Sequence, residues 1–231
     1  YFDEDFRLVE LGSGSSQKTR ILIDMLTQLQ KHVEYFPIDI SKILKNSSAS
    51  LQSDYKKLHI TGIIDSYENG LKFVKNYDNL KNLIVFLGSS FGNFNPENGM
   101  KFLQKMNSSM KNGDLFLIGL DLVKDKKILQ QAYNDSQGIT AQFNLNVLSR
   151  INSELGGNFD VSKFVHHAIY NAEQNKIEMY LRSLVKQTVQ IPNADLMLEI
   201  DENELIHTEN SHKYTISQIK QMFKITGYQI K

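Results

Sequence analysis

Five short apolar runs, rich in β-branched side chains, recur along the first half of the chain. Amphipathic stretches lie between several of them, as in residues 19–30 and 95–106, where apolar side chains return every three or four positions. Strands that alternate with helices predict a parallel sheet, and burial on both faces explains why these strands are continuously apolar. We therefore predict a doubly wound α/β unit with strands over 7–11, 34–38, 58–64, 82–87 and 114–120.

The second half of the chain has a different pattern. Residues 129–155 predict two helices joined at Gly138, and residues 164–185 predict two strands joined by a polar turn. A last helix over 216–227 ends at Gly227, in a position that favours a glycine cap. We expect an α/β core with a small α+β substrate-binding insertion over its strand ends. The predicted boundaries are 1–134 for the core, 135–212 for the insertion and 213–231 for a return to the core.

Several predicted elements have recognisable ends. Thr19 precedes the first helix as a cap, and Asn95 followed by Pro96 opens the helix over 95–106. The final residues, GYQIK, resemble the start of a strand. Because the chain also begins with Tyr1 rather than Met, we expect a fragment truncated at both ends.

Composition narrows the class of protein. Lys plus Arg and Asp plus Glu balance at 26 each without a run of like charge, so the electrostatic footprint for nucleic acid or an anionic membrane is missing. No apolar segment approaches the roughly 18 residues that cross a bilayer. The absence of cysteine removes zinc-thiolate sites and thiol nucleophiles. We expect a soluble, cytoplasmic protein whose partner is a small molecule, and a monomer is compatible with this sequence.

The candidate chemistry lies at the carboxyl ends of the predicted strands, where open parallel sheets bind their ligands. The first strand runs into Gly12 and Gly14, whose lack of Cβ lets the backbone approach a ligand closely. Asp39 follows the second strand, where a carboxylate can accept hydrogen bonds from ribose hydroxyls, and Asp65 follows the third. Together these features predict a nucleoside site. The alternative is that the glycines only shape a turn and Asp39 caps the next helix.

The glycine pattern favours one nucleoside over another. Gln17 occupies the position of the third glycine in the dinucleotide fingerprint, so a pyrophosphate is disfavoured. Glu10, just before the loop, suits a ligand that carries positive charge. The form ELGSG is typical of enzymes that use S-adenosylmethionine, and we predict that cofactor.

Seven segments are distinctive, namely VELGSGSSQKTR, PIDIS, FLGSSFGNFNP, LIGLDLVKD, AYNDSQGITAQFNLNVLSRIN, KIEMYL and HTENSHKY. In their order and spacing they resemble the histidine Nα-methyltransferases of ergothioneine biosynthesis. ELGSG is shared by most class I methyltransferases, whereas the AYND and TENS segments together are specific. The resemblance extends over essentially the whole chain and implies a Rossmann-like class I fold. It also implies three methyl transfers from S-adenosylmethionine to the α-amino group of L-histidine, giving hercynine.

The resemblance implies cofactor contacts at the strand ends. Gly12, with Gly14 in the same loop, and Lys18 correspond to contacts with the methionine end of the cofactor. Asp39 corresponds to the ribose ligand and Asp65 to the adenine contact.

The resemblance also implies groups that hold the amino and carboxylate groups of the substrate. These are Asn93 and Tyr133, with a backbone group of Gly88 nearby. Without the resemblance, Asn93 is more simply a turn residue and Tyr133 an amphipathic helix residue with an exposed hydroxyl.

A third set corresponds to the imidazole site. Glu209 and Ser211 resemble the pair that binds the ring, and Met179 resembles a residue that lines the pocket. Glu209 can accept from one ring N–H, while Ser211 can donate to the other nitrogen or accept from it. The ordinary alternatives are a solvated loop carboxylate for Glu209 and a core position for Met179.

Neither a metal nor a general base is assigned. His166 and His167 are adjacent on a predicted strand and so point to opposite faces, and no nearby spacing completes a metal site. Methyl transfer needs a neutral amine held in line with the departing sulfur, so orientation should supply most of the catalysis.

Three other functions stay open on the residues alone. A relative could methylate another aromatic amine, such as an indole amino acid, although an indole offers one N–H and no acceptor to the Glu209 and Ser211 pair. A nucleoside-binding domain without catalysis is the second. An NAD-dependent oxidoreductase is the third, and Gln17 disfavours it.

Overall fold

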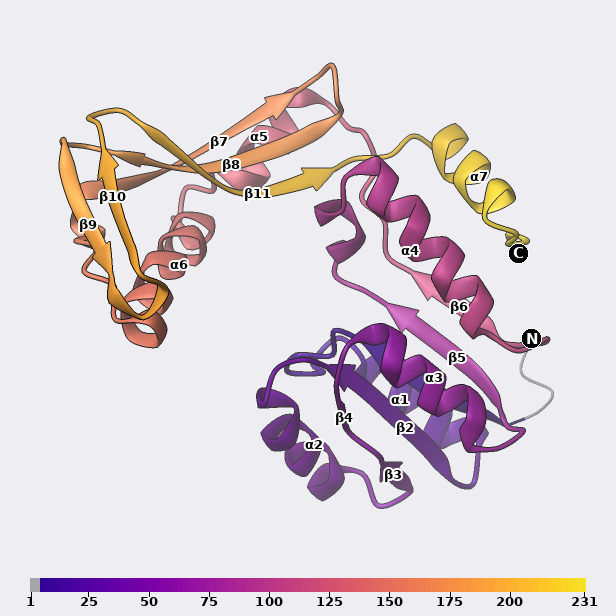
Figure 1. The fold of residues 1–231 in the computed structure, drawn as a ribbon. Coiled ribbons are helices and arrows are strands. Elements are labelled where there is room, and N and C mark those ends of the chain that lie inside the picture. Colours follow the sequence, from indigo (N-terminus) through magenta and orange to yellow (C-terminus); the bar gives the residue numbers. More distant parts are fainter. Residues whose placement is uncertain (1–4) are drawn as a thin grey trace. The chain divides into compact units, whose positions relative to one another are not determined.

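The computed structural model describes residues 5–231 (Figure 1), and these divide into two units. The first contains the described residues up to Phe91, Pro96–Leu120 and Ile216–Lys231, and the second contains Gly92–Asn95 and Asp121–Thr215. This division groups residues 121–134 with the second unit, whereas the sequence assigned them to the core. The reason is packing, because the helix α5 (Lys126–Tyr133) lies against β7 (Phe164–Asn171) of that unit.

The first unit is built on a parallel sheet with the order β3-β2-β1-β5-β6, which confirms the predicted α/β fold. The strand order reverses at the junction of β1 and β5, the place where ligands bind in such sheets. Its main strands are β1 (Phe6–Leu11), β2 (Val33–Asp39), β3 (Leu58–Ile60), β5 (Lys81–Phe86) and β6 (Leu115–Ile118). Its helices are α1 (Arg20–Leu29), α2 (Ile43–Asp54), α3 (Tyr67–Tyr77), α4 (Pro96–Ser109) and α7 (Ile216–Ile225).

One predicted strand is interrupted. The run over 58–64 forms β3 and a separate short strand, β4 (Ile63–Ile64), both paired with β2. Thr61 stays attached to β2 through a hydrogen bond from its N–H to the Tyr35 carbonyl, at 3.0 Å. The chain therefore reaches the carboxyl edge of the sheet in two steps.

The core of the first unit surrounds β1, whose six residues are all buried. Leu8 and Val9 are neighbours that point to opposite faces, and both are 0% exposed. Helices therefore cover this strand on both sides, as a continuously apolar parallel strand requires. Residues that pack in the same core include Ile23, Leu26, Val33, Tyr35, Leu51 and Val85.

The predicted element ends are correct in part. Helix α4 begins at Pro96, and Gly227 follows α7 with a left-handed φ of 83°. Thr19 does occupy the cap position of α1, but its side chain makes no capping hydrogen bond and instead donates to Glu10. The predicted strand start at the end of the chain is wrong, because the Tyr228 ring packs on Phe223 and its hydroxyl donates to a carbonyl of α4.

The second unit holds an antiparallel sheet with the order β11-β8-β7. The predicted hairpin is confirmed by β7 and β8 (Lys176–Ser183), and the predicted helix pair by α5 and α6 (Ile139–Leu155) with Gly138 between them. The sequence missed three strands, namely the ribbon of β9 (Gln187–Ile191) and β10 (Leu196–Ile200) and the strand β11 (Leu205–His212). Across residues 5–231, no helix is both long and apolar enough to span a bilayer.

Candidate functional site

The glycine loop after β1 has the backbone that the sequence predicts. Gly12 and Gly14 adopt φ angles of 67° and 50°, in the left-handed region that favours glycine. A Cβ on Gly12 would lie 2.8 Å from the Tyr67 hydroxyl oxygen, so a side chain there would be strained and crowded. The loop thus leaves open backbone at the carboxyl end of the central strand.

Asp39 ties this loop to the end of β2. One carboxylate oxygen accepts from the Gly14 N–H at 3.0 Å, and the other accepts from the Ser41 N–H at 2.8 Å. Helix α2 begins only at Ile43 with Lys42 at its cap, so Asp39 does not cap that helix. The carboxylate is half-buried next to the glycines, where a nucleoside ribose would need it.

Lys18 and Gly88 meet at the reversal of strand order. Gly88, just beyond β5, has a φ of 81°, and a Cβ on it would lie 3.2 Å from the Lys18 ammonium nitrogen. A side chain at residue 88 would crowd the Lys18 ammonium group, so glycine permits this close approach. Gly88 thus contacts Lys18 within the first unit, and its role beside the substrate stays a prediction.

Asp65 lies exposed beyond β4, the outer strand end. It accepts from the Asn69 side chain at 2.8 Å and from the Ser66 N–H at 2.6 Å. These hydrogen bonds, that of Asn69 most strongly, hold the pKa of Asp65 below its usual value. The carboxylate is therefore an anionic acceptor, as an adenine amino group would require.

Glu10 points inward rather than toward a ligand. It is 4% exposed and accepts from the Thr19 and Tyr35 hydroxyls. Burial raises its pKa, although both hydrogen bonds oppose the rise. Glu10 thus anchors the glycine loop from behind, and its suitability as a counter-charge for a cationic ligand stays a prediction.

In the second unit, three polar side chains lie on one side of β11 and of the residue just past it. Glu209, Ser211 and Lys213 are two residues apart, so they project from the same side of the strand. Glu209 pairs across the sheet with Met179, and Ser211 pairs with Ile177. This side of the sheet faces α5, because Leu129 of that helix packs with Met179 and Ile177.

Asn93 reaches the same strand from the short segment 92–95. A Cβ on Gly92 would lie 2.9 Å from the His212 carbonyl oxygen, so glycine permits this approach. Asn93, with its amide oriented as the surrounding donors and acceptors require, donates to Glu209 Oε1 and to the Asn210 carbonyl, both at 3.2 Å. Burial raises the pKa of Glu209, and the charge of Lys213 opposes this rise.

Tyr133 and Ser211 form the second half of this cluster. The Tyr133 hydroxyl donates to Ser211 Oγ at 2.8 Å. Lys213, whose side chain is fully buried, donates to Tyr133 Oη at 2.9 Å and to Ser211 Oγ at 2.7 Å. It also forms an ion pair with Asp121 at 3.2 Å. Burial would raise the pKa of Asp121, but the hydrogen bond from Lys124 and the charge of Lys213 hold it below its usual value.

Tyr133 is also held through its backbone. His166 Nε2 contacts the Tyr133 carbonyl at 2.8 Å, and the Asn144 amide donates to His166 Nδ1 at 2.9 Å. His166 therefore carries its proton on Nε2 and donates it to that carbonyl. The His166 ring, which was considered as a metal ligand in the sequence, thus fixes the backbone of the candidate site residue Tyr133.

The predicted substrate residues are thus only partly brought together. Asn93 meets Glu209, and Tyr133 meets Ser211, while Met179 is 3% exposed and packs in the core beneath them. Sequence reasoning missed Lys213 and Asp121, although both lie in segments of the resemblance. Residues 207–213 are polar at every position, so no local pattern distinguishes Lys213 from its solvated neighbours.

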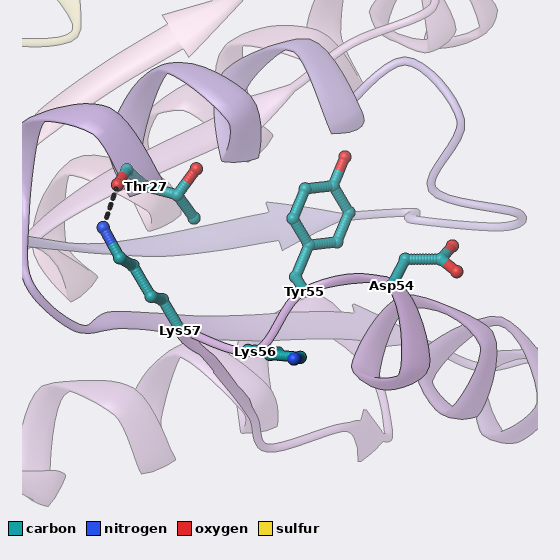
Figure 2. Close-up of a pocket in the computed structure, with 5 residues that line it drawn as sticks. All are labelled: Thr27, Asp54, Tyr55, Lys56 and Lys57. Carbon is teal, nitrogen blue, oxygen red and sulfur yellow. Dashed lines mark hydrogen bonds between the residues drawn. The ribbon is translucent and has the colours of Figure 1, made fainter.

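Figure 2 shows a pocket in the first unit, lined by none of the predicted site residues. Lys57 donates to the Thr27 carbonyl at 3.1 Å across it. The segment that lines it leads into β3, so it lies at the amino end of that strand, whereas ligands bind at carboxyl ends. We assign it no role. Its lining residues are Thr27, Asp54, Tyr55, Lys56 and Lys57.

The first unit is an α/β fold with a glycine loop at the carboxyl end of its central strand. Proteins of this class bind nucleosides at that edge of the sheet. Residues 2–231 match the family model described as "Histidine-specific methyltransferase, SAM-dependent". The chain belongs to that family, as the resemblance of its motifs predicts.

Three curated relatives illustrate the range of this similarity. A histidine N-alpha-methyltransferase of Mycobacterium tuberculosis is 39% identical, over 90% of this chain and 64% of its own length. Ergothioneine biosynthesis protein 1 of Neurospora crassa is 27% identical, over 95% of this chain and 25% of its own. An L-tryptophan methyltransferase of Psilocybe serbica is 24% identical, over 95% and 66%. The chain thus spans just under two thirds of the mycobacterial relative.

Proposed function

We propose that the protein transfers methyl groups from S-adenosylmethionine to the α-amino group of L-histidine, three times, giving hercynine for ergothioneine biosynthesis in the cytoplasm. The observation that carries the proposal is the second-unit cluster, in which Asn93 meets Glu209 and Tyr133 meets Ser211. In this cluster the carboxylate of Glu209 and the hydroxyl of Ser211 come from residues two apart on one strand, whose Cα atoms are about 7 Å apart. An imidazole with one hydrogen bond at each nitrogen can bridge that interval.

The first unit supplies a fitting place for the cofactor. Open backbone at Gly12 and Gly14, the Asp39 carboxylate beside them and Lys18 against Gly88 fit a nucleoside with an amino acid tail. When bound, S-adenosylmethionine supplies an electrophilic methyl group on a sulfonium. Asp39 would hold the ribose, and Asp65 the adenine.

The second unit orients the amino acid. Glu209 accepts from the imidazole N–H, and Asn93 exchanges its internal partner for the substrate carboxylate. The Tyr133 oxygen keeps a lone pair for an N–H of the substrate amine, while its proton goes to Ser211. With the ring and carboxylate fixed, the amine can rotate between successive transfers.

Calorimetry tests this proposal directly. L-histidine is titrated into the chain saturated with S-adenosylhomocysteine, and Glu209→Ala should weaken binding at least tenfold because it removes a charged acceptor. Glu202→Ala, an exposed glutamate of the same unit, is the matched control and should bind like the parent. Mass spectrometry of the product then counts the methyl groups.

Two results would contradict the proposal. Bound nucleoside without histidine binding would indicate a cofactor-binding relative with another substrate. Tighter binding of L-tryptophan than of L-histidine would indicate the indole branch of the family, whose ring offers Ser211 no acceptor.

A further inference from the structure

The Lys213 ammonium has all three of its N–H donors occupied. They point to Ser211 Oγ at 2.7 Å, to Tyr133 Oη at 2.9 Å and to Asp121 Oδ2 at 3.2 Å. The side chain is 0% exposed, so each of these partners offsets the cost of removing the charge from water. Its nitrogen also lies 4.8 Å from the centre of the Tyr133 ring.

This arrangement fixes the direction of the Ser211 hydroxyl. A serine oxygen has two lone pairs and one proton. One lone pair accepts from Lys213 at 2.7 Å, and the other accepts from the Tyr133 hydroxyl at 2.8 Å. The proton is the one hydrogen-bonding function of Ser211 that a ligand can use, so Ser211 can only donate.

We infer that Lys213 is a positioning residue that fixes the hydrogen-bond direction at the ring site, so that Glu209 accepts from the ring and Ser211 donates to it. This inference rests on the proposed function and deepens it. The preferred ring is a neutral five-membered heterocycle with an N–H on one side and a bare nitrogen on the other. A ring without the bare nitrogen leaves the Ser211 proton unpaired in a buried place.

The partners of Lys213 are themselves held in place. Asp121 balances the lysine charge from behind, and the backbone of Tyr133 is fixed by His166. Removing Lys213 would free a lone pair of Ser211, and its proton could then turn away from the ligand. Recognition of the bare ring nitrogen would be lost although Glu209 and Ser211 are both still present.

The test compares L-histidine with the two isomers of L-pyrrolylalanine, which keep one ring N–H and replace the other nitrogen with C–H. Binding is measured by calorimetry with S-adenosylhomocysteine present. The parent chain should prefer histidine over the better isomer by about tenfold to a hundredfold. In Lys213→Met this preference should fall below about threefold, as in Ser211→Ala, and the double variant should fall no further.

Two further variants keep the result interpretable. Asp121→Asn combined with Lys213→Met removes both charges together, so no carboxylate is left without its partner, and it should show the same lost preference. Lys186→Met, on an exposed lysine of the same unit, should leave the preference unchanged.

The outcomes separate this inference from the proposed function. If Lys213→Met weakens both ligands equally and keeps the preference, Lys213 is only structural and the inference is wrong, while histidine binding by the parent still supports the function. If the parent binds nucleoside but no histidine, the proposed function fails and the inference fails with it.

Discussion

The strands of the two units use their side chains differently. Every residue of β1 is buried, whereas in β8 buried and half-buried positions alternate along the whole strand. A strand covered on both faces has no side chain left for chemistry, so the first unit places its polar groups in loops beyond the strand ends. In the second unit, by contrast, β11 carries Glu209 and Ser211 on the side that faces α5, where Asn93 and Tyr133 provide their hydrogen-bond partners.

The largest expected effect tests this difference in burial. Leu8→Ala should destabilise the protein by about 2–5 kcal/mol, and its neighbour Val9→Ala by at least about 1 kcal/mol, because both side chains are buried. In β9, Ile191→Ala should cost about 2–5 kcal/mol, but its exposed neighbour Gln190→Ala should stay within about 0.5 kcal/mol. Urea unfolding followed by circular dichroism measures all four. If Val9→Ala left the free energy of unfolding unchanged, burial on both faces of β1 would be contradicted.

A smaller effect tests the loop chemistry of the first unit. Asp39→Asn should weaken binding of S-adenosylhomocysteine by about tenfold to a hundredfold, because it removes a charged acceptor and leaves one oxygen to accept from both the Gly14 and Ser41 N–H groups. Asp54→Asn is the control, since that exposed carboxylate lies in the pocket at the other end of the sheet. Equal binding by Asp39→Asn and the parent chain would remove Asp39 from the nucleoside site.

The smallest effect concerns the strand face of the second unit. Because burial raises the pKa of Glu209, the folded state holds its proton more tightly than the unfolded state does. Its ionisation therefore costs stability above the raised pKa, and this cost disappears below the unfolded value. Glu209→Gln should raise the melting temperature at pH 7 by about 1–3 °C and have no such effect near pH 4. Glu202→Gln serves as the exposed control, and a lower melting temperature for Glu209→Gln at pH 7 would contradict the cause given for the shift.

Much of the first unit could be predicted because its signals are local. Apolar runs located the strands, and glycines located the backbone that has left-handed φ angles at residues 12 and 14. Thr19 shows where local signals fail, since the buried Glu10 carboxylate competes for its hydroxyl and the capping bond is lost. The break between β3 and β4 likewise depends on pairing with β2.

The second unit was harder to predict because its site depends on distant partners. Asn93 lies more than a hundred residues from Glu209, and only the resemblance to a family placed them in one site. Lys213 was missed because a single lysine in a polar segment is ordinarily solvated. Its burial follows from Asp121 and Tyr133, which no pattern near residue 213 reveals.

The two units are interleaved along the chain, and this has a consequence for synthesis on the ribosome. A nascent chain extended to Thr215 already contains every residue of the second unit, but it lacks α7. Asn107 then has no Thr226 carbonyl to bind, and Phe116 has no Tyr228 ring beside it. Within the described residues the first unit is therefore completed only after the second, and until then Phe116 and Asn107 lack these partners.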